Sequence, residues 1–153
     1  MGEGKDIIQI RNHISIGPSP NKHEYVKGEL DRFDVIICLC EIRGFYKPPG
    51  NKIAVHIPLI IAEGKNLPRE RQNLILAARI IRDFYKARKN IYCHCWDGHT
   101  RCATAVALAL VRDGKDIECR MKQLKEIGKG QIDFGGGSWG KLASDIKTID
   151  SKF

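Results

Sequence analysis

Hydrophobic positions fall into short alternations and runs of the kind that form β-strands. Isoleucines alternate with other residues between positions 7 and 16, which predicts a strand or hairpin ended by Gly17-Pro18. A continuous apolar run over 34–40 predicts a strand covered on both faces, as in the interior of a parallel sheet. Two further strands are expected at 52–57 and 90–94.

Between and after these strands, the spacing of apolar residues is typical of helices. From Pro68 to Lys86, apolar residues recur every three or four positions, which predicts an amphipathic helix. Shorter helices are expected at 23–33, 104–111, 117–127 and 138–149, with loops at 58–67 and 128–137. Strands that alternate with helices predict an α/β fold with a central, mostly parallel sheet flanked by helices. Ligand sites in such sheets lie beyond the carboxyl ends of the strands.

Length and composition are typical of one globular domain. The 153 residues fit a single domain over 1–153, and 42% hydrophobic with 29% charged residues excludes a disordered chain. No apolar run is long enough to span a membrane, and the first six residues lack the features of a signal peptide, so we expect a cytoplasmic protein. The formal charge of +8 favours an anionic ligand or partner. Nothing in the sequence indicates an oligomeric state.

Six cysteines in a chain expected to stay in a reducing compartment indicate free thiols, metal ligands or catalysis rather than a disulfide framework. The pairs Cys38-x-Cys40 and Cys93-x-Cys95, on neighbouring strands, are a candidate tetrathiolate zinc site. Structural zinc sites favour C-x2-C loops, however. We therefore interpret Cys38, Cys40 and Cys93 as small core residues, and we expect no metal or other cofactor.

The segment from His94 to Arg101 joins the expected strand at 90–94 to a helix. A cysteine in this position faces backbone N–H groups and the positive end of the helix dipole, which favour the thiolate. Cys95 is therefore the candidate nucleophile. The five residues between Cys95 and Arg101 can wrap a tetrahedral anion in successive amides, and Gly98 permits the turn. Because Arg101 can offer a planar fork to two phosphate oxygens, the segment predicts a loop that both holds and attacks a phosphate ester.

This H-C-x5-R spacing, with glycine at the third position after the cysteine, resembles the signature of the cysteine-dependent protein tyrosine and dual-specificity phosphatases. His56-Ile57-Pro58 resembles the strand end before that family's general-acid loop. The resemblance implies a protein tyrosine phosphatase-like fold and hydrolysis of phosphomonoesters without a metal: the thiolate forms a phosphocysteine, which water then cleaves. It also implies phosphorylated proteins as partners, with phosphotyrosine alone or together with phosphoserine or phosphothreonine as the substrate.

Applied to this chain, the resemblance makes Cys95 the nucleophile and Arg101 the group that binds the phosphoryl oxygens. It gives His94 and Cys102 supporting roles, with His94 orienting the loop and helping to keep the thiol ionised. Backbone amides complete the phosphate-binding cradle, and they belong to Trp96, Asp97, Gly98, His99, Thr100 and Arg101.

Three positions depart from the family's pattern. The loop after Pro58 lacks the usual general-acid aspartate, and Glu63 is the nearest replacement. Cys102 stands where the family has Ser or Thr, and because a thiol is the weaker hydrogen-bond donor we expect slow hydrolysis of the phosphocysteine. If Cys102 lies near Cys95, oxidation would also join the two in a reversible disulfide. Asp97 puts an acid inside the loop, as a substrate-binding group or an alternative proton donor.

These departures leave three alternatives open. The H-C-x-D-G sequence is also similar to the loop of myotubularin-type phosphoinositide phosphatases. The RNA 5′-phosphatases of the same superfamily lack the mobile-loop acid too, because their phosphate leaving group needs no protonation, and a charge of +8 suits an RNA 5′ end. The third alternative is a module that captures phosphorylated partners without cleaving them.

Overall fold

One mostly parallel sheet organises the part of the chain that the computed structural model describes, which comprises residues 7–20, 24–40, 50–59, 68–95, 100–111, 116–132, 134, 138–147 and 149. Its strands follow the order β1-β2-β5-β3-β4. They are β1 (Ile8–Arg11), β2 (Ile14–Gly17), β3 (Val35–Cys38), β4 (Ile53–His56) and β5 (Ile91–His94). β1 pairs antiparallel with β2, and the other neighbouring pairs are parallel. The expected hairpin near the N-terminus and the α/β fold with a mostly parallel sheet are confirmed.

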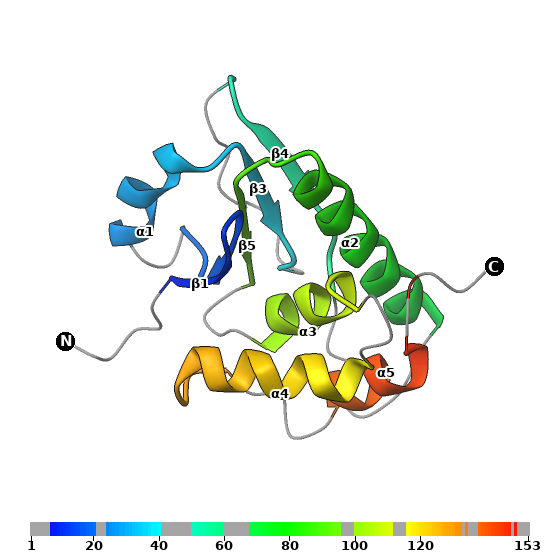
Figure 1. Ribbon diagram of the computed structural model, residues 1–153. Helices are drawn as coiled ribbons and strands as arrows, with labels where there is room; N and C mark the ends of the chain where they lie inside the picture. Colours follow the sequence, from blue (N-terminus) through cyan, green and yellow to red (C-terminus); the bar gives the residue numbers. More distant parts are fainter. Residues whose placement is uncertain are drawn as a thin grey trace.

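Helices lie on both faces of this sheet (Figure 1). On one face lie α1 (Glu24–Glu29) and a 3-10 turn (Leu30–Arg32), which pack against Ile36 and Tyr92. The other face carries the larger part of the core and four helices. These are α2 (Pro68–Lys86), α3 (Thr100–Ala109), α4 (Ile117–Gly128) and α5 (Ser138–Ile146).

The helix expected from Pro68 to Lys86 is confirmed at both ends. Other helix ends differ: the helix expected at 23–33 is α1 followed by the 3-10 turn, and α3 ends at Ala109 rather than 111. α3 begins at Thr100, before the expected start at 104, because its first two residues, Thr100 and Arg101, are polar and partly exposed and so do not extend the apolar pattern. α5 ends at Ile146 rather than 149. The next residue, Lys147, has φ of 67°, and a left-handed residue of this kind ends a helix.

The parallel strands end at one common edge. Cys38 of β3 is in register with both His56 of β4 and His94 of β5. Hydrogen bonds continue beyond the strands: Leu39 N donates to His94 O at 2.8 Å, and Leu59 N donates to Leu39 O at 3.2 Å. The residues that follow β3, β4 and β5 therefore lie side by side at the carboxyl edge of the sheet.

Arg82 of α2 holds the far end of α3. Its side chain is buried, its Nε donates to Ala109 O at 3.0 Å, and its Nη2 donates to Val111 O at 2.8 Å. A guanidinium in this position satisfies the last carbonyls of the helix and interacts favourably with its dipole. The position of α3 is thus fixed at the end opposite to the one that begins at Thr100.

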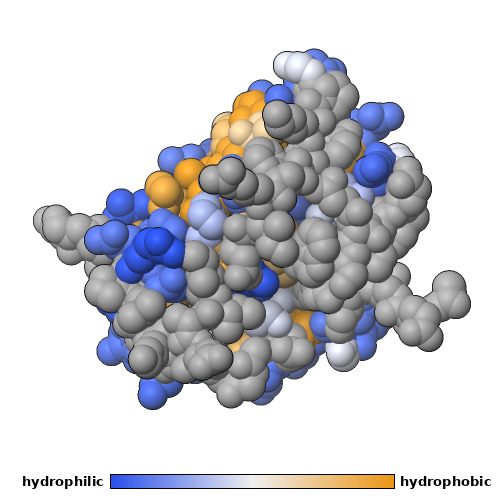
Figure 2. Space-filling model, turned by 180° about the vertical axis from the view of Figure 1, so that it is seen from behind, coloured by the Kyte–Doolittle hydropathy of each residue, from blue (hydrophilic) through white to orange (hydrophobic). Residues whose placement is uncertain are grey.

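Large apolar side chains also reach the surface. Figure 2 shows a band of apolar residues in the upper part of the face opposite to that of Figure 1. The exposed large hydrophobic residues of the described chain include Ile53 on β4, Leu76 on α2 and Ile127 on α4. Among the described helices, none combines the length and the apolar character that a membrane crossing would require.

Gly17, at the end of β2, packs so closely against Tyr92 that no side chain fits at this position. A Cβ at this position would overlap the hydroxyl of Tyr92, which is fully buried and donates to Pro18 O at 2.6 Å. Because the ring has no room to move, we expect Gly17→Ala to lower the free energy of unfolding by about 1–3 kcal/mol in urea denaturation.

Gly28 on α1 supplies the matched control, since a Cβ there would meet no atom within 4 Å. Gly28→Ala should leave the stability unchanged or raise it by up to about 1 kcal/mol, because alanine is the better helix former. Equal stabilities for the two variants would contradict the close contact between Gly17 and Tyr92.

Candidate active site

Cys95 is the first residue after β5, and its thiol lies at the carboxyl edge of the sheet against the start of α3. The residue is 3% exposed, and its Sγ lies 3.7 Å from Sγ of Cys102. Backbone N–H groups of Arg101 and Cys102 donate to the Cys95 sulfur. The sulfur therefore faces the N-terminal end of a ten-residue helix, where an anion is stabilised.

These contacts lower the pKa of the Cys95 thiol from 9.0 to about 6. The largest cause is the hydrogen bond from the Cys102 thiol; the Cys102 and Arg101 amides and the positive charge of Arg101 act in the same direction, and burial opposes them. Cys102 itself has a pKa raised well above 9.0, first by burial and then by the same contact with Cys95. The surroundings therefore favour the thiolate at Cys95 and the protonated thiol at Cys102.

Arg101 lies on the first turn of α3 and reaches across the edge of the sheet. Its Nη1 donates to Leu59 O at 2.8 Å and lies 3.5 Å from Leu39 O. These carbonyls belong to the segments that follow β4 and β3, so the arginine connects α3 to two strand ends. The structure thus brings Cys95, Cys102 and Arg101 together, and the role of each in a reaction stays a prediction.

His94, the last residue of β5, is fully buried beside Cys95. Its Nδ1 lies 3.3 Å from the carbonyl oxygen of Cys95, and its ring stacks on Tyr92 with 5.7 Å between the centroids. The His94 ring therefore contacts the backbone of Cys95. This position suits the predicted role of orienting the loop.

Several predicted site residues lie outside the described part of the chain. They are Glu63, Trp96, Asp97, Gly98 and His99. The identity of the general acid and most of the amide cradle therefore stay predictions. Thr100 is described as the first residue of α3, and its carbonyl accepts a 2.7 Å hydrogen bond from Thr104 Oγ1.

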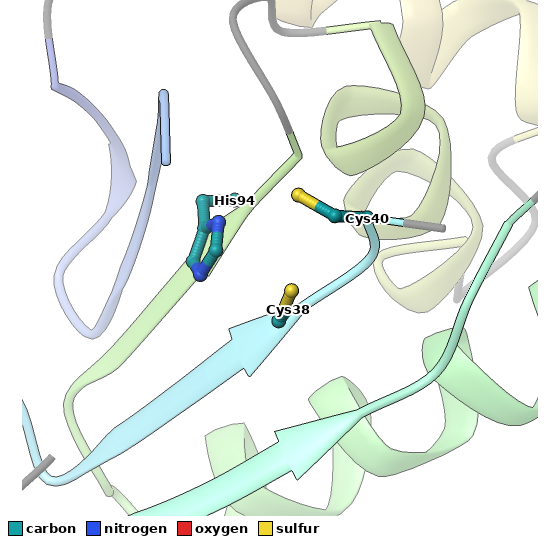
Figure 3. A group of neighbouring side chains, drawn as sticks. All are labelled: Cys38, Cys40 and His94. Atoms are coloured by element: carbon teal, nitrogen blue, oxygen red, sulfur yellow. The ribbon is translucent and has the colours of Figure 1, made fainter. Parts of the chain in front are cut away.

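Sequence reasoning missed one cluster of side chains. Cys38, Cys40 and His94 lie together, with one ligand atom from each within 4.8 Å of the others (Figure 3). Cys93, in contrast, is in register with Ile37 and packs in the core beneath α2 and α3. The alternative of a tetrathiolate zinc site is therefore excluded, because alternation along β5 turns Cys93 away from Cys38, and the expected burial of Cys38, Cys40 and Cys93 is confirmed. Cys38 and His94 each lie in a predicted strand. Pairing these two strands in parallel, in the register that the structure has, would have placed Cys38 beside His94.

Comparisons with known proteins identify the fold. No family model and no curated protein matches the sequence. Among solved structures, human DUSP28 superposes with a TM-score of 0.71 at 11% identity, covering 94% of this chain and 97% of that one. Tk-PTP in its active form gives 0.70 at 14% identity, with 95% and 97% covered. PTP-2 phosphatase of Cydia pomonella gives 0.68 at 17% identity, with 92% and 89% covered. The chain therefore has the fold of the tyrosine and dual-specificity phosphatases.

The low pKa of Cys95 predicts its reactivity. We expect alkylation of Cys95 by iodoacetamide, followed by peptide mass spectrometry, to rise with pH through a midpoint near 6, because only the thiolate reacts. Cys102→Ala removes the largest cause of the low pKa, so the midpoint should move up by about one pH unit or more. Cys119, partly exposed on α4, provides an internal comparison in the same digest. A Cys95 midpoint that does not respond to Cys102→Ala would contradict this account of the pKa.

Proposed function

We propose that this protein is a cysteine-dependent phosphatase that hydrolyses phosphomonoesters on phosphorylated proteins, with phosphotyrosine as the first substrate and phosphoserine or phosphothreonine as further ones. The observation that carries the proposal is the position of the buried Cys95 thiol at the N-terminal end of α3, beside Arg101 and 3.7 Å from Cys102 Sγ, where its pKa is lowered. A buried thiolate next to helix amides and a guanidinium is suited to attack an electrophile that carries negative charge.

The reaction proceeds in two displacements at phosphorus. In the first, the Cys95 sulfur forms a bond to phosphorus as the bond to the ester oxygen breaks, and the leaving oxygen takes a proton for which Glu63 and Asp97 are the candidate donors. Water then attacks the phosphocysteine and gives a proton back to the carboxylate that lost one in the first step; the sulfur–phosphorus bond breaks, and phosphate leaves while Cys95 returns to the thiolate. Arg101 and the loop amides hold the phosphoryl oxygens and their transition-state charge in both steps.

Cys102 acts on the sulfur in the second step. Its thiol lies 3.7 Å from Cys95 Sγ, the place from which a donor stabilises the departing thiolate. A thiol donates a weaker hydrogen bond than a hydroxyl does. The departure of sulfur from phosphorus is therefore slower here than with serine at this position, and breakdown of the phosphocysteine limits turnover.

The choice of phosphoproteins as substrates is supported by the fold that the chain shares with human DUSP28 and with the Cydia pomonella phosphatase. The net charge of +8 favours an anionic substrate but does not separate a phosphoprotein from an inositol phosphate or an RNA 5′ end. Those two substrate classes are therefore the alternatives that a substrate comparison distinguishes.

Hydrolysis of p-nitrophenyl phosphate tests the mechanism, because its phenolate leaves readily without a strong acid. We expect Cys95→Ser to lower kcat by about a thousandfold or more. Arg101→Lys should lower kcat and raise KM, because lysine lacks the planar fork. Cys102→Ser should raise kcat by about twofold to tenfold, because the hydroxyl is the better donor to the departing sulfur.

Cys119→Ser is the matched control, since Cys119 lies on α4 outside the site, and its activity should equal that of the parent protein. Substantial activity in Cys95→Ser would refute the cysteine mechanism. The substrate class is then tested by comparing phosphate release from phosphotyrosine peptide, inositol phosphate and RNA 5′-triphosphate at equal concentration. A higher kcat/KM for either of the last two would overturn the phosphoprotein assignment and leave the mechanism standing.

A further inference from the structure

A second group of chemically active side chains lies behind the nucleophile. Cys38 is the last residue of β3, Cys40 follows two residues later, and His94 is in register with Cys38 on β5. The three residues are 0%, 3% and 0% exposed. Figure 3 shows both sulfur atoms and the imidazole ring directed into the same space between the two strands. One ligand atom from each residue lies within 4.8 Å of the other two.

The imidazole of His94 presents a free nitrogen. Nδ1 lies 3.3 Å from the carbonyl oxygen of Cys95, an acceptor, so Nδ1 carries the proton and the lone pair is on Nε2. Nε2 is buried and has no hydrogen-bond partner among the described residues. Histidines that bind metals characteristically donate their other ring N–H to a carbonyl in this way. A buried basic nitrogen beside two cysteine thiols is suited to a soft cation that replaces the thiol protons.

We propose that Cys38, Cys40 and His94 bind one Zn²⁺ ion. The two thiols lose their protons to solvent as two zinc–sulfur bonds form, and Nε2 of His94 supplies the third bond. Two thiolates balance the charge of the ion, so a neutral complex replaces the thiols in a buried place. The fourth tetrahedral position is left for water or for another ligand.

The distances require only a small adjustment. Tetrahedral Zn²⁺ with bonds of about 2.0–2.3 Å holds its sulfur and nitrogen ligands about 3.6–3.8 Å apart. The present limit of 4.8 Å therefore has to shorten by about 1 Å, which rotation of the two cysteine side chains supplies.

This zinc site is distinct from the candidate active site. Cys95 is paired with Cys102 against α3, whereas Cys38 and His94 share the face of the sheet on which Tyr92 packs. The two sites meet at His94, because coordination of Nε2 strengthens donation from Nδ1 to the Cys95 carbonyl. The ion thereby holds the backbone at the start of the phosphate loop.

Direct metal binding tests the proposal without any substrate, so its failure leaves the phosphatase assignment untouched. Full-length protein is made metal-free with a chelator under reducing conditions, and Zn²⁺ or Co²⁺ is then added. We expect one equivalent of tightly bound zinc by elemental analysis, and thiolate-to-cobalt charge-transfer absorption with the intense visible bands of tetrahedral Co²⁺.

Cys40→Ser is the principal variant, because Cys40 lies beyond the end of β3 and its replacement is least disruptive to the sheet. It should weaken zinc binding by more than about 100-fold, since second-shell changes alone cost 10–100-fold. His94→Gln should do the same, and circular dichroism of each metal-free variant shows whether it is folded.

Cys95→Ser and Cys119→Ser are the matched controls, and both should bind zinc as the parent protein does. Absence of stoichiometric zinc in the parent protein would overturn the proposal. So would undiminished binding in folded Cys40→Ser, or loss of binding in Cys95→Ser, which would place the ion on the nucleophile instead.

Discussion

The structure depends on one contact, between the sulfur of Cys95 and the N-terminal end of α3. Cys93, two residues earlier on the same strand, has a pKa raised well above 9.0, mainly by burial and further by the neighbouring Cys95 and Cys40. Cys95 is buried almost as deeply, yet its pKa falls to about 6, because the Cys102 thiol, two backbone amides and the charge of Arg101 all favour the anion. The start of α3 therefore distinguishes Cys95, whose pKa is lowered, from Cys93, whose pKa is raised.

The parallel sheet makes this contact possible and also creates the second cluster. β2, β3 and β4 run in the same direction as β5 or as one another, so their carboxyl ends share one edge. Along β5, alternation directs Cys93 to the helical core and His94 to the opposite face, where Cys38 lies in register. Cys95, just beyond the strand, meets α3. The end of β5 thus places the candidate nucleophile, Cys95, against α3 and the candidate zinc ligand, His94, on the opposite face of the sheet.

The sequence predicted the fold well because its signals are local. Alternation, apolar runs and Pro68 defined the strands and the longest helix, and the H-C-x5-R spacing placed Cys95 between a strand and a helix. The start of α3 was missed because Thr100 and Arg101 are polar, and the end of α5 because a left-handed Lys147 has no sequence signal. The Cys38–His94 pairing depends on register between strands far apart in the sequence, which no local pattern contains.

The central claim is that the Cys95 sulfur accepts a phosphoryl group. The most direct measurement is mass spectrometry of the protein mixed with p-nitrophenyl phosphate and quenched with acid within its first turnovers. The account predicts a mass increase of one phosphoryl group on the peptide that contains Cys95, accumulating in the parent protein and absent from Cys95→Ser. A phosphoryl group on a different residue, or product release from protein that never carries one, would contradict it.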